Sequence, residues 1–561
     1  MMNRALRFLS VEIRGLHQAA YLLAAFALAS QVLGLVRDRI LAASFGAGHT
    51  LDIYYAAFRL PDLLFATVAS LFSLYALLPV LSRLESEGEG LMAPFLRDTL
   101  WFFFAAMSLI SLILFALAPA LAPLIAPGLA GAAGPSAELV LLMRVLLLQP
   151  ILLGASNTIA SLTQLRHRFV LYSVSPLLYN LGIIFGAVAL YPRFGALGLG
   201  WGVVLGAVLH MAVQMPYFLA ERTRARLPLS SFLARIAAVM TLSVPRTLAL
   251  ASTQLSLLAM TAIASFLSTG SITIFNFAIT LQAVPLTIIG VSYSVAAFPT
   301  LARLHAQGAK AEFLQHIEAA LRHILFWSIP ATVFTIVMRA QIVRLVLGAG
   351  RFDWSATRLT AAALALLIIS LSAQSITLLI ARAYYAAGNT RKPLYYGLAD
   401  IAVSILSALL LTALFKTNPF FRDFIGSLLR VEDVPGVAIL MLAFGYALGS
   451  IAEGAVSYYY FTRDFSISRA RLARLMFECF ASAVIGGGVA YLLLSATGAA
   501  GQINTTIALL AQTLFAGTIG LAVSFFMLWV LNNEELAEAL SALRRRFRDV
   551  PQVSVEPSDV S

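Results

Sequence analysis

The sequence has little charge, one cysteine and none of the common catalytic motifs. Only 11% of its 561 residues are charged and 60% are hydrophobic, whereas a soluble domain carries about 25% charged residues. The single cysteine, Cys479, excludes a disulfide within the chain and is expected to be a small core residue. Gly-x-Ser-x-Gly, Walker-type loops, His-Glu-x-x-His and Cys-x-x-Cys are all missing, and the histidines are dispersed. We therefore expect no enzyme, no ATP-driven pump, no metal site and no cofactor.

Long apolar runs take the place of charge. A helix needs about 20 apolar residues to cross a bilayer, and the sequence holds about fourteen such runs. The expected fold class is an all-α polytopic membrane protein in a lipid bilayer. No cleavable signal peptide is evident at the basic start of the chain. The candidate spans lie near residues 19–45, 54–82, 98–126, 138–164, 169–191, 196–220, 237–267, 273–304, 319–347, 357–387, 394–415, 436–461, 474–496 and 505–532.

The formal net charge of +12 comes from arginines scattered between these runs. They form no single stripe, so nucleic-acid binding is not expected. The even-numbered loops are rich in Arg and Lys, most odd-numbered loops are poor in them, and the eleventh loop is mixed. The positive-inside rule then places both termini in the cytoplasm, which requires an even number of spans.

The chain also resembles itself at long range. Residues 42–60 resemble residues 262–281, and 79–84 resemble 299–304. Six spans in each copy preserve the orientation, so the repeat is parallel, with a pseudo-twofold axis along the membrane normal. The expected organisation is an N-lobe (1–225), a C-lobe (226–465), two extra spans (466–532) and a basic cytoplasmic tail (533–561).

The apolar stretch 30–84 carries charges that are costly in lipid. A charge at membrane depth costs about 2.5–3.5 kcal/mol on insertion scales, so such groups usually face a bundle interior or a wet cavity. Arg37 could bind an anionic group, with Asp38 orienting it or holding a cation; alternatively, the helix ends early and Arg37 snorkels to the interface. Arg59 is a second candidate contact. Asp52 is either a further site residue or a helix N-cap at the outer surface.

Two prolines and one acid are candidates for motion and coupling. Pro61 frees a backbone carbonyl at membrane depth, which is tolerated where the carbonyl faces a cavity. Pro285 is its counterpart in the second copy, and both are predicted to bend or gate. Glu453 lies in the middle of an apolar run, where it could pair with an arginine or take a proton.

Several motifs carry a family resemblance. They are VLGLVRDRILAASFGAG, AFRLPDLL, LLPVLSRL, SPLLYNLGII, VPLTIIGVS and ARAYYAAGNTRKP, in this order. With them the sequence resembles the MurJ (MviN) lipid II flippase family of the multidrug/oligosaccharidyl-lipid/polysaccharide exporter superfamily. The resemblance implies a role in peptidoglycan biosynthesis in the bacterial cytoplasmic (inner) membrane.

The resemblance also implies a mechanism. Two lobes around a cationic cavity would rock between inward-open and outward-open states while undecaprenyl-pyrophosphate-linked disaccharide-peptide crosses. The two C-terminal spans would form a groove for the lipid tail. A monomer is expected, driven by a coupling ion or the membrane potential.

The sequence departs from the family pattern inside the cavity. Gln31, Phe65 and Thr280 stand where the family typically has basic residues. Fewer arginines predict a weaker anion site, whose cationic wall comes mainly from the first lobe through Arg37 and Arg59. The sequence therefore leaves three functions open: a lipid II flippase, an exporter of another polyprenyl-linked glycan or amphipathic substrate, and a non-transporting envelope scaffold.

Overall fold

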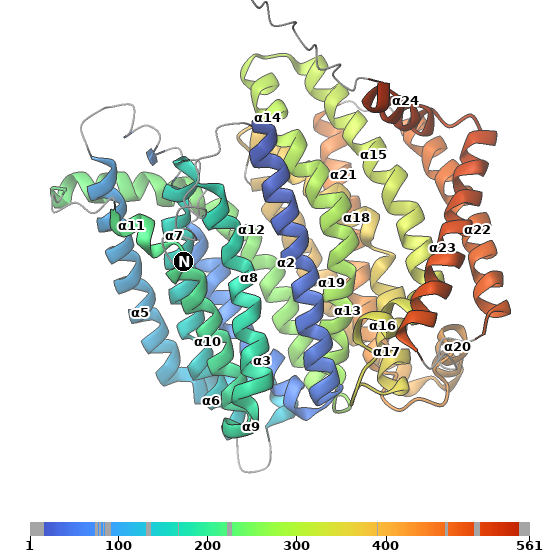
Figure 1. The fold of residues 1–561 in the computed structure, drawn as a ribbon, viewed down its shortest axis with the longest axis horizontal. Coiled ribbons are helices and arrows are strands. Elements are labelled where there is room, and N and C mark those ends of the chain that lie inside the picture. Colours follow the sequence, from blue (N-terminus) through green and yellow to red (C-terminus); the bar gives the residue numbers. More distant parts are fainter. Residues whose placement is uncertain are drawn as a thin grey trace, which may run out of the picture.

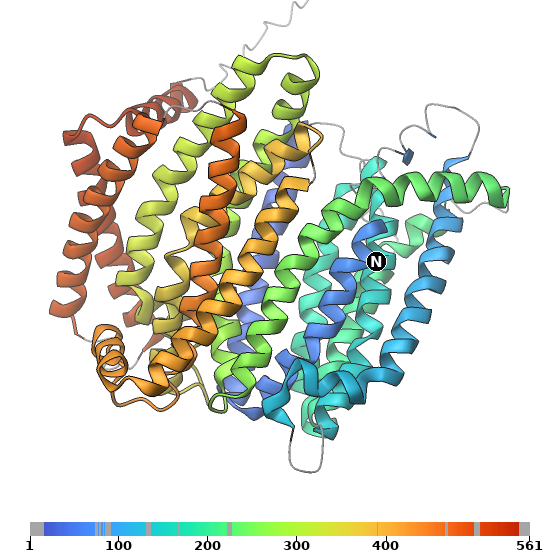
Figure 2. The same cartoon turned by 180° about the vertical axis from the view of Figure 1, so that it is seen from behind.

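The structure is a computed structural model that describes residues 16–72, 91–130, 136–166, 168–220, 227–389, 391–465, 469–498 and 505–548, together with residues 77, 80, 81 and 84. Within these residues every regular element is a helix. The helices of the first half of the chain stand beside those of the second half, as Figures 1 and 2 show from opposite sides.

The first half contains nine α-helices among the described residues. They are α2 (Leu16–Phe45), α3 (His49–Thr67), α5 (Met92–Ile125), α6 (Ala137–Leu146), α7 (Leu148–Leu165), α8 (Phe169–Phe185), α9 (Tyr191–Phe194), α10 (Ala196–Ala212) and α11 (Met215–Ala220). Short 3-10 turns follow α3 (Ala69–Phe72) and α5 (Pro127–Leu129), and a π-helical turn, η3 (Gly186–Leu190), follows α8.

The second half continues the same pattern of long helices. They are α12 (Leu229–Ser265), α13 (Ser271–Leu286), α14 (Ser292–Ala306), α15 (Lys310–Val337), α16 (Arg339–Leu347), α17 (Trp354–Ile368), α18 (Leu371–Ala386), α19 (Arg391–Thr417), α20 (Pro419–Leu429) and α21 (Ile439–Asp464). Three helices follow: α22 (Arg469–Ala496), α23 (Thr506–Val530) and α24 (Glu534–Arg548).

The expectation of a polytopic helical membrane protein is confirmed at this level. The described residues contain nine helical segments long and apolar enough to cross a membrane, or up to ten if α17 and α18, which meet at 47°, form one bent span. The predicted run 319–347 is divided at Met338 into α15 and α16. The total of fourteen spans stays a prediction.

Helix α12 connects the two halves. Its apolar parts are two short stretches, Leu229–Thr241 and Leu250–Ser265. Figure 2 shows its first part running sideways across the upper end of the first half before it descends between the halves. There α12 packs against α3 on one side and α19 on the other. It is therefore placed to contribute side chains to contacts between the halves.

Small residues let α8 approach the neighbouring helix α10 closely. A Cβ on Gly182 would lie 2.3 Å from the Cα of Gly206, and one on Gly186 would lie 2.5 Å from the Cα of Gly202. Glycine is therefore needed at this crossing, as is common where helices pack in membranes. Helix α8 in turn packs against α2 and brings Asn180 to it.

Both predicted proline positions lie inside helices. Helix α3 runs through Pro61 and ends at Thr67. Helix α13 contains Pro285 and passes directly into a π-helical turn, η4 (Thr287–Val291), before α14. A π-helical turn is a common cause of a local bend, so the two proline positions differ in their local geometry.

The two halves meet at the end of the bundle where α2 finishes and α3 begins, which we call the α2–α3 end; it is the lower end in Figure 1. The backbone N–H of Arg351 donates to the carbonyl of Ala43 at 2.9 Å. Gly270 has φ +91°, and a Cβ there would lie 2.4 Å from the carbonyl oxygen of Ala47. The segments are so close that the chain requires glycine at this loop.

Candidate substrate-binding site

Arg37 and Asp38 lie side by side on α2 and face α8. The Nε of Arg37 donates to Oδ1 of Asp38 at 2.9 Å, and its Nη1 donates to Oδ1 of Asn180 at 3.0 Å. The Arg37 side chain is 25% exposed, whereas the Asp38 side chain is 3% exposed. Oδ2 of Asp38 is buried and has no hydrogen-bond partner among the described residues. The pair therefore presents a partly open guanidinium that its neighbours hold in place.

Arg59 joins the two halves of the molecule. It is buried on α3, and its Nε donates to Oγ1 of Thr261 on α12 at 2.7 Å. Its Nη2 donates to Oδ1 of Asn276 on α13 at 2.5 Å. These partners are neutral, so the positive charge of Arg59 is hydrogen-bonded without being neutralised by them.

Asp52 caps a helix of the other half. Its Oδ2 accepts the backbone N–H of Gly270 at 2.6 Å, and its Oδ1 accepts the backbone N–H and the hydroxyl of Thr273 at 2.8 and 2.7 Å. The first N–H groups of a helix lack partners within the helix, and a carboxylate satisfies them while complementing the helix dipole. Asp52 thus performs a capping role, but for α13 rather than for its own helix.

Aromatic residues connect these charged groups. Tyr54 and Tyr55 follow Asp52 on α3, with ring centroids 5.4 Å apart. Tyr55 lies within electrostatic range of Arg37, Asp38 and Arg59. The structure therefore brings three of the four predicted site residues around one tyrosine, while Asp52 lies toward the α2–α3 end.

Glu453 lies in the second half with another acid. Its electrostatic neighbour is Asp400 of α19, and Tyr446 lies within electrostatic range of Asp400, Glu453 and Arg59. The sequence favoured an arginine partner or a proton; the neighbour that the structure provides is a second carboxyl group. No group of three or more His, Cys, Asp or Glu side chains in the described part of the chain could hold a metal ion.

Sequence reasoning did not identify the partners of the two arginines. Asn180, Thr261 and Asn276 are ordinary residues in apolar runs, and Asn or Gln in such a place most often bridges helices. Only the fold shows that these oxygens receive guanidinium N–H groups. The one available signal was the self-similarity of the chain. It makes the α13 region, which holds Asn276, the counterpart of the α3 region, which holds Arg59.

Charged groups held inside an apolar helical bundle, and bonded from one half to the other, define the class: a multi-pass membrane transporter. The comparisons with known proteins give the family. A family model described as "Lipid II flippase MurJ" matches residues 41–421. The chain belongs to the MurJ lipid II flippase family.

Curated relatives agree with the family model. The lipid II flippase MurJ of Burkholderia cenocepacia is 27% identical over 412 residues, which cover 70% of this chain and 77% of the relative. A probable lipid II flippase MurJ of Rhizobium tropici is 27% identical over 478 residues, covering 83% and 85%.

Solved structures agree on the fold. A lipid II flippase MurJ in an inward closed conformation superposes with a TM-score of 0.69 at 19% identity, covering 91% of this chain and all of that one. An inward-facing multidrug resistance MATE transporter of the MOP superfamily gives 0.63 at 14% identity, covering 78% and 94%.

Proposed function

We propose that this protein flips lipid II, the undecaprenyl-pyrophosphate-linked disaccharide-peptide, across the cytoplasmic membrane by alternating access. Two six-span lobes, 1–225 and 226–465, would move against each other, and the two spans within 466–532 would complete a set of fourteen. Family membership supports the cargo. A monomer is sufficient, because one chain supplies the residues on both sides of the site.

The proposal rests on the position, the exposure and the orientation of the Arg37 side chain. It lies inside the bundle, is partly exposed, and is oriented by Asp38 and Asn180. A guanidinium has five N–H groups in a planar fork, and such a fork suits phosphate oxygens. Asp38 and Asn180 engage only some of them, so the others remain for a pyrophosphate. Arg59 would be the second contact once its bonds to α12 and α13 open.

The contacts at the α2–α3 end support alternating access. Besides Asp52 with Gly270 and Thr273, Arg39 donates to the carbonyls of Leu345 and Val346 at 2.6 and 3.2 Å. These bonds hold the two halves together at that end. We propose that it is the outer end, closed in this state, and that outward opening breaks these bonds. Pro61 and the Pro285–η4 segment would provide the bends.

Both chain ends would lie in the cytoplasm. The start of α2 and helix α24 are at the same end of the bundle, opposite the α2–α3 end (Figure 1). The arginine-rich even-numbered loops of the sequence would lie at this end, as the positive-inside rule requires. The tail 533–561 would then be cytoplasmic.

Energy coupling would use the membrane potential or a cation at the acidic pair of the second half. Asp400 accepts a hydrogen bond from Ser404 at 3.3 Å and lies within electrostatic range of Glu453. Two neighbouring carboxyl groups repel each other when both are charged, so one proton or cation between them relieves that repulsion. Tyr446 lies within electrostatic range of both this pair and Arg59, and would connect the coupling site to the substrate site.

A different cargo has one observation in its favour. Gln31, Phe65 and Thr280 remove cationic positions, and Arg59 is already bound to Thr261 and Asn276. A polyprenyl-linked glycan with less charge would suit a weaker anion site. A scaffold without transport would need neither arginine.

Complementation tests the proposal. Cells depleted of their own flippase should grow when they express the wild-type chain and should fail to grow with Arg37→Ala. Arg144→Ala is the matched control, because Arg144 is an arginine of the same half that packs on Phe115 away from this site. Good membrane expression of the wild type without rescue would favour another cargo. Equal growth with Arg37→Ala would refute the site.

A further inference from the structure

The helix α24 starts from a firmly held turn at the end of α23. Asn532 has φ +53° and turns the chain, and Oδ1 of Asn533 accepts the N–H of Leu536 at 3.0 Å as an N-cap. Nδ2 of Asn533 donates to Glu478 of α22 at 2.7 Å, and Glu478 also accepts from Arg474 at 2.6 Å. The first turn of α24 is therefore fixed to α22.

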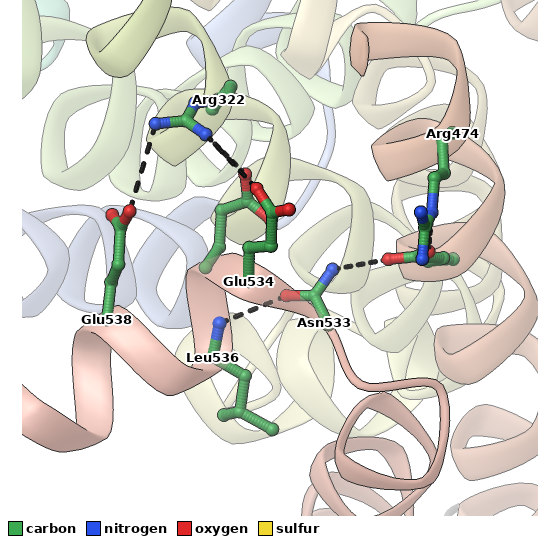
Figure 3. A network of polar contacts seen from close by, with 8 residues as sticks. Arg322, Arg474, Asn533, Glu534, Leu536 and Glu538 are labelled. Carbon is green, nitrogen blue, oxygen red and sulfur yellow. Dashed lines mark hydrogen bonds and ion pairs between the residues drawn. The ribbon is translucent and has the colours of Figure 1, made fainter.

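A single arginine fixes the direction of α24. Arg322 of α15 lies 3.4 Å from Glu535, 3.8 Å from Glu534 and 3.9 Å from Glu538. Figure 3 shows Arg322 between the acidic side chains of α24, with Asn533 reaching in the other direction. Figure 1 shows that α24 lies across the ends of the spans instead of continuing α23 away from them. A helix that begins four residues after a membrane span and turns sideways runs along the membrane surface.

The sequence register of α24 gives it one apolar side. Residues 536, 540, 543 and 547 are Leu, Leu, Leu and Phe. At about 100° per residue they fall within about 60° of one another around the helix axis. Leu536 is buried against the bundle, whereas Leu540 is 43% exposed. The apolar side thus starts on the protein at Leu536 and is already partly exposed at Leu540.

The charge of α24 changes sign along its length. The first five residues contain Glu534, Glu535 and Glu538, and the last five contain Arg544, Arg545, Arg546 and Arg548. In the helical register, positions 544 and 546 flank the apolar side, each about 80° from residue 536. An apolar stripe bordered by arginines is typical of helices that lie in the interface of an anionic bilayer.

We propose that α24 is an interfacial membrane anchor whose C-terminal part binds anionic phospholipid headgroups. The acidic first turn docks on Arg322, and the apolar side of the helical register would continue past Leu540 into the headgroup region. The arginine cluster supplies the charge complementarity, since each arginine near an anionic surface strengthens binding about fivefold. This inference does not depend on the transported cargo.

Hydrogen exchange of the intact protein in nanodiscs tests the proposal. Amides of residues 540–548 should exchange more slowly in discs that contain phosphatidylglycerol than in discs of phosphatidylcholine alone. The triple variant R544Q/R545Q/R546Q should remove this difference in exchange rate. For three charges, the protection lost in the anionic discs should be up to about a hundredfold. High salt should weaken it in the same way. The matched control K310Q/R391Q/R463Q removes the same charge from exposed positions outside α24 and should leave the protection unchanged.

A second readout follows the apolar side directly. With Cys479 replaced by alanine, an environment-sensitive probe is attached at L543C on the apolar side or at S541C on the opposite side. Only the probe at position 543 should report an apolar environment, and only in anionic discs. Equal exchange in both lipids, unchanged exchange in the triple variant, or the same signal from both probes would each overturn the proposal.

Discussion

The carboxylate of Asp52, in the first turn of α3, caps the first turn of α13 through Thr273. The two residues are 221 positions apart in the chain, and Asp52 accepts both the N–H and the hydroxyl of Thr273. The start of the second helix of the first half is thereby bonded to the start of α13 in the second half. The two halves therefore cannot separate at the α2–α3 end unless this bond breaks.

Asp52→Ala should shift the protein toward a state that is open at the α2–α3 end. Loss of an N-cap costs about 0.5–2 kcal/mol, which changes a two-state ratio by roughly twofold to thirtyfold. Spin labels at positions 49 and 351, on a Cys479→Ala background, should report a larger population of long distances. Thr273→Val removes only the hydroxyl bond and should give a smaller shift. Distances identical to those of the wild type would show that the cap does not hold this end closed.

Asn276→Ala should weaken the same closed state by another route. It leaves one buried guanidinium nitrogen of Arg59 without its amide oxygen partner, and such a loss costs about 1–3 kcal/mol. The double variant with Arg59→Ala should cost less than the sum of the two single changes, because they share one bond. Thermal unfolding of the purified variants measures this coupling, and strict additivity would contradict the contact.

Gly270→Ala should destabilise the fold more than Gly308→Ala. Both glycines have positive φ, +91° and +70°, so either substitution introduces backbone strain of roughly 1 kcal/mol. A Cβ at Gly308 meets nothing within 4 Å, whereas one at Gly270 would lie 2.4 Å from a backbone oxygen of Ala47. The melting temperatures should separate the two variants, and equal values would mean that the loops are not packed so closely.

The ion pair between Arg358 and Asp433 should give a small stabilisation that depends on pH. Hydrogen bonds from Arg358 hold the pKa of the Asp433 carboxyl below its ordinary value. The stabilisation is therefore present above about pH 4, the unfolded-state value, and is lost as the pH falls through the lower folded-state pKa. The difference in melting temperature between the wild type and Asp433→Asn should shrink in acid. A difference that grows in acid would reverse this sign.

Much of the architecture could be predicted because apolar length and loop charge act locally along the chain. The runs near 474–496 and 505–532 correspond closely to α22 and α23, and the stretch 98–126 lies within α5 except for its last residue. The break at Met338, inside an apolar run, was missed. A bend was predicted at Pro285, but the π-helical turn that follows it was not. Composition does not distinguish a continuous span from a broken one.

The candidate site was predictable as a set of residues but not as a set of contacts. Arg37, Asp38, Asp52 and Arg59 stand out because charge is costly in lipid. Their partners Asn180, Thr261 and Thr273 come from distant helices, and no local pattern selects them. The tail was expected only as a basic segment; the structure adds that it forms α24 as far as Arg548.

Arg37 is proposed to contact the pyrophosphate of lipid II during transport. The most direct measurement is the amount of lipid II exposed on the outer leaflet of flippase-depleted cells that express the chain at matched levels. The wild type and Arg144→Ala should restore exposure, while Arg37→Ala should lose most of it. Exposure restored by Arg37→Ala to the wild-type level would show that Arg37 is not needed for transport.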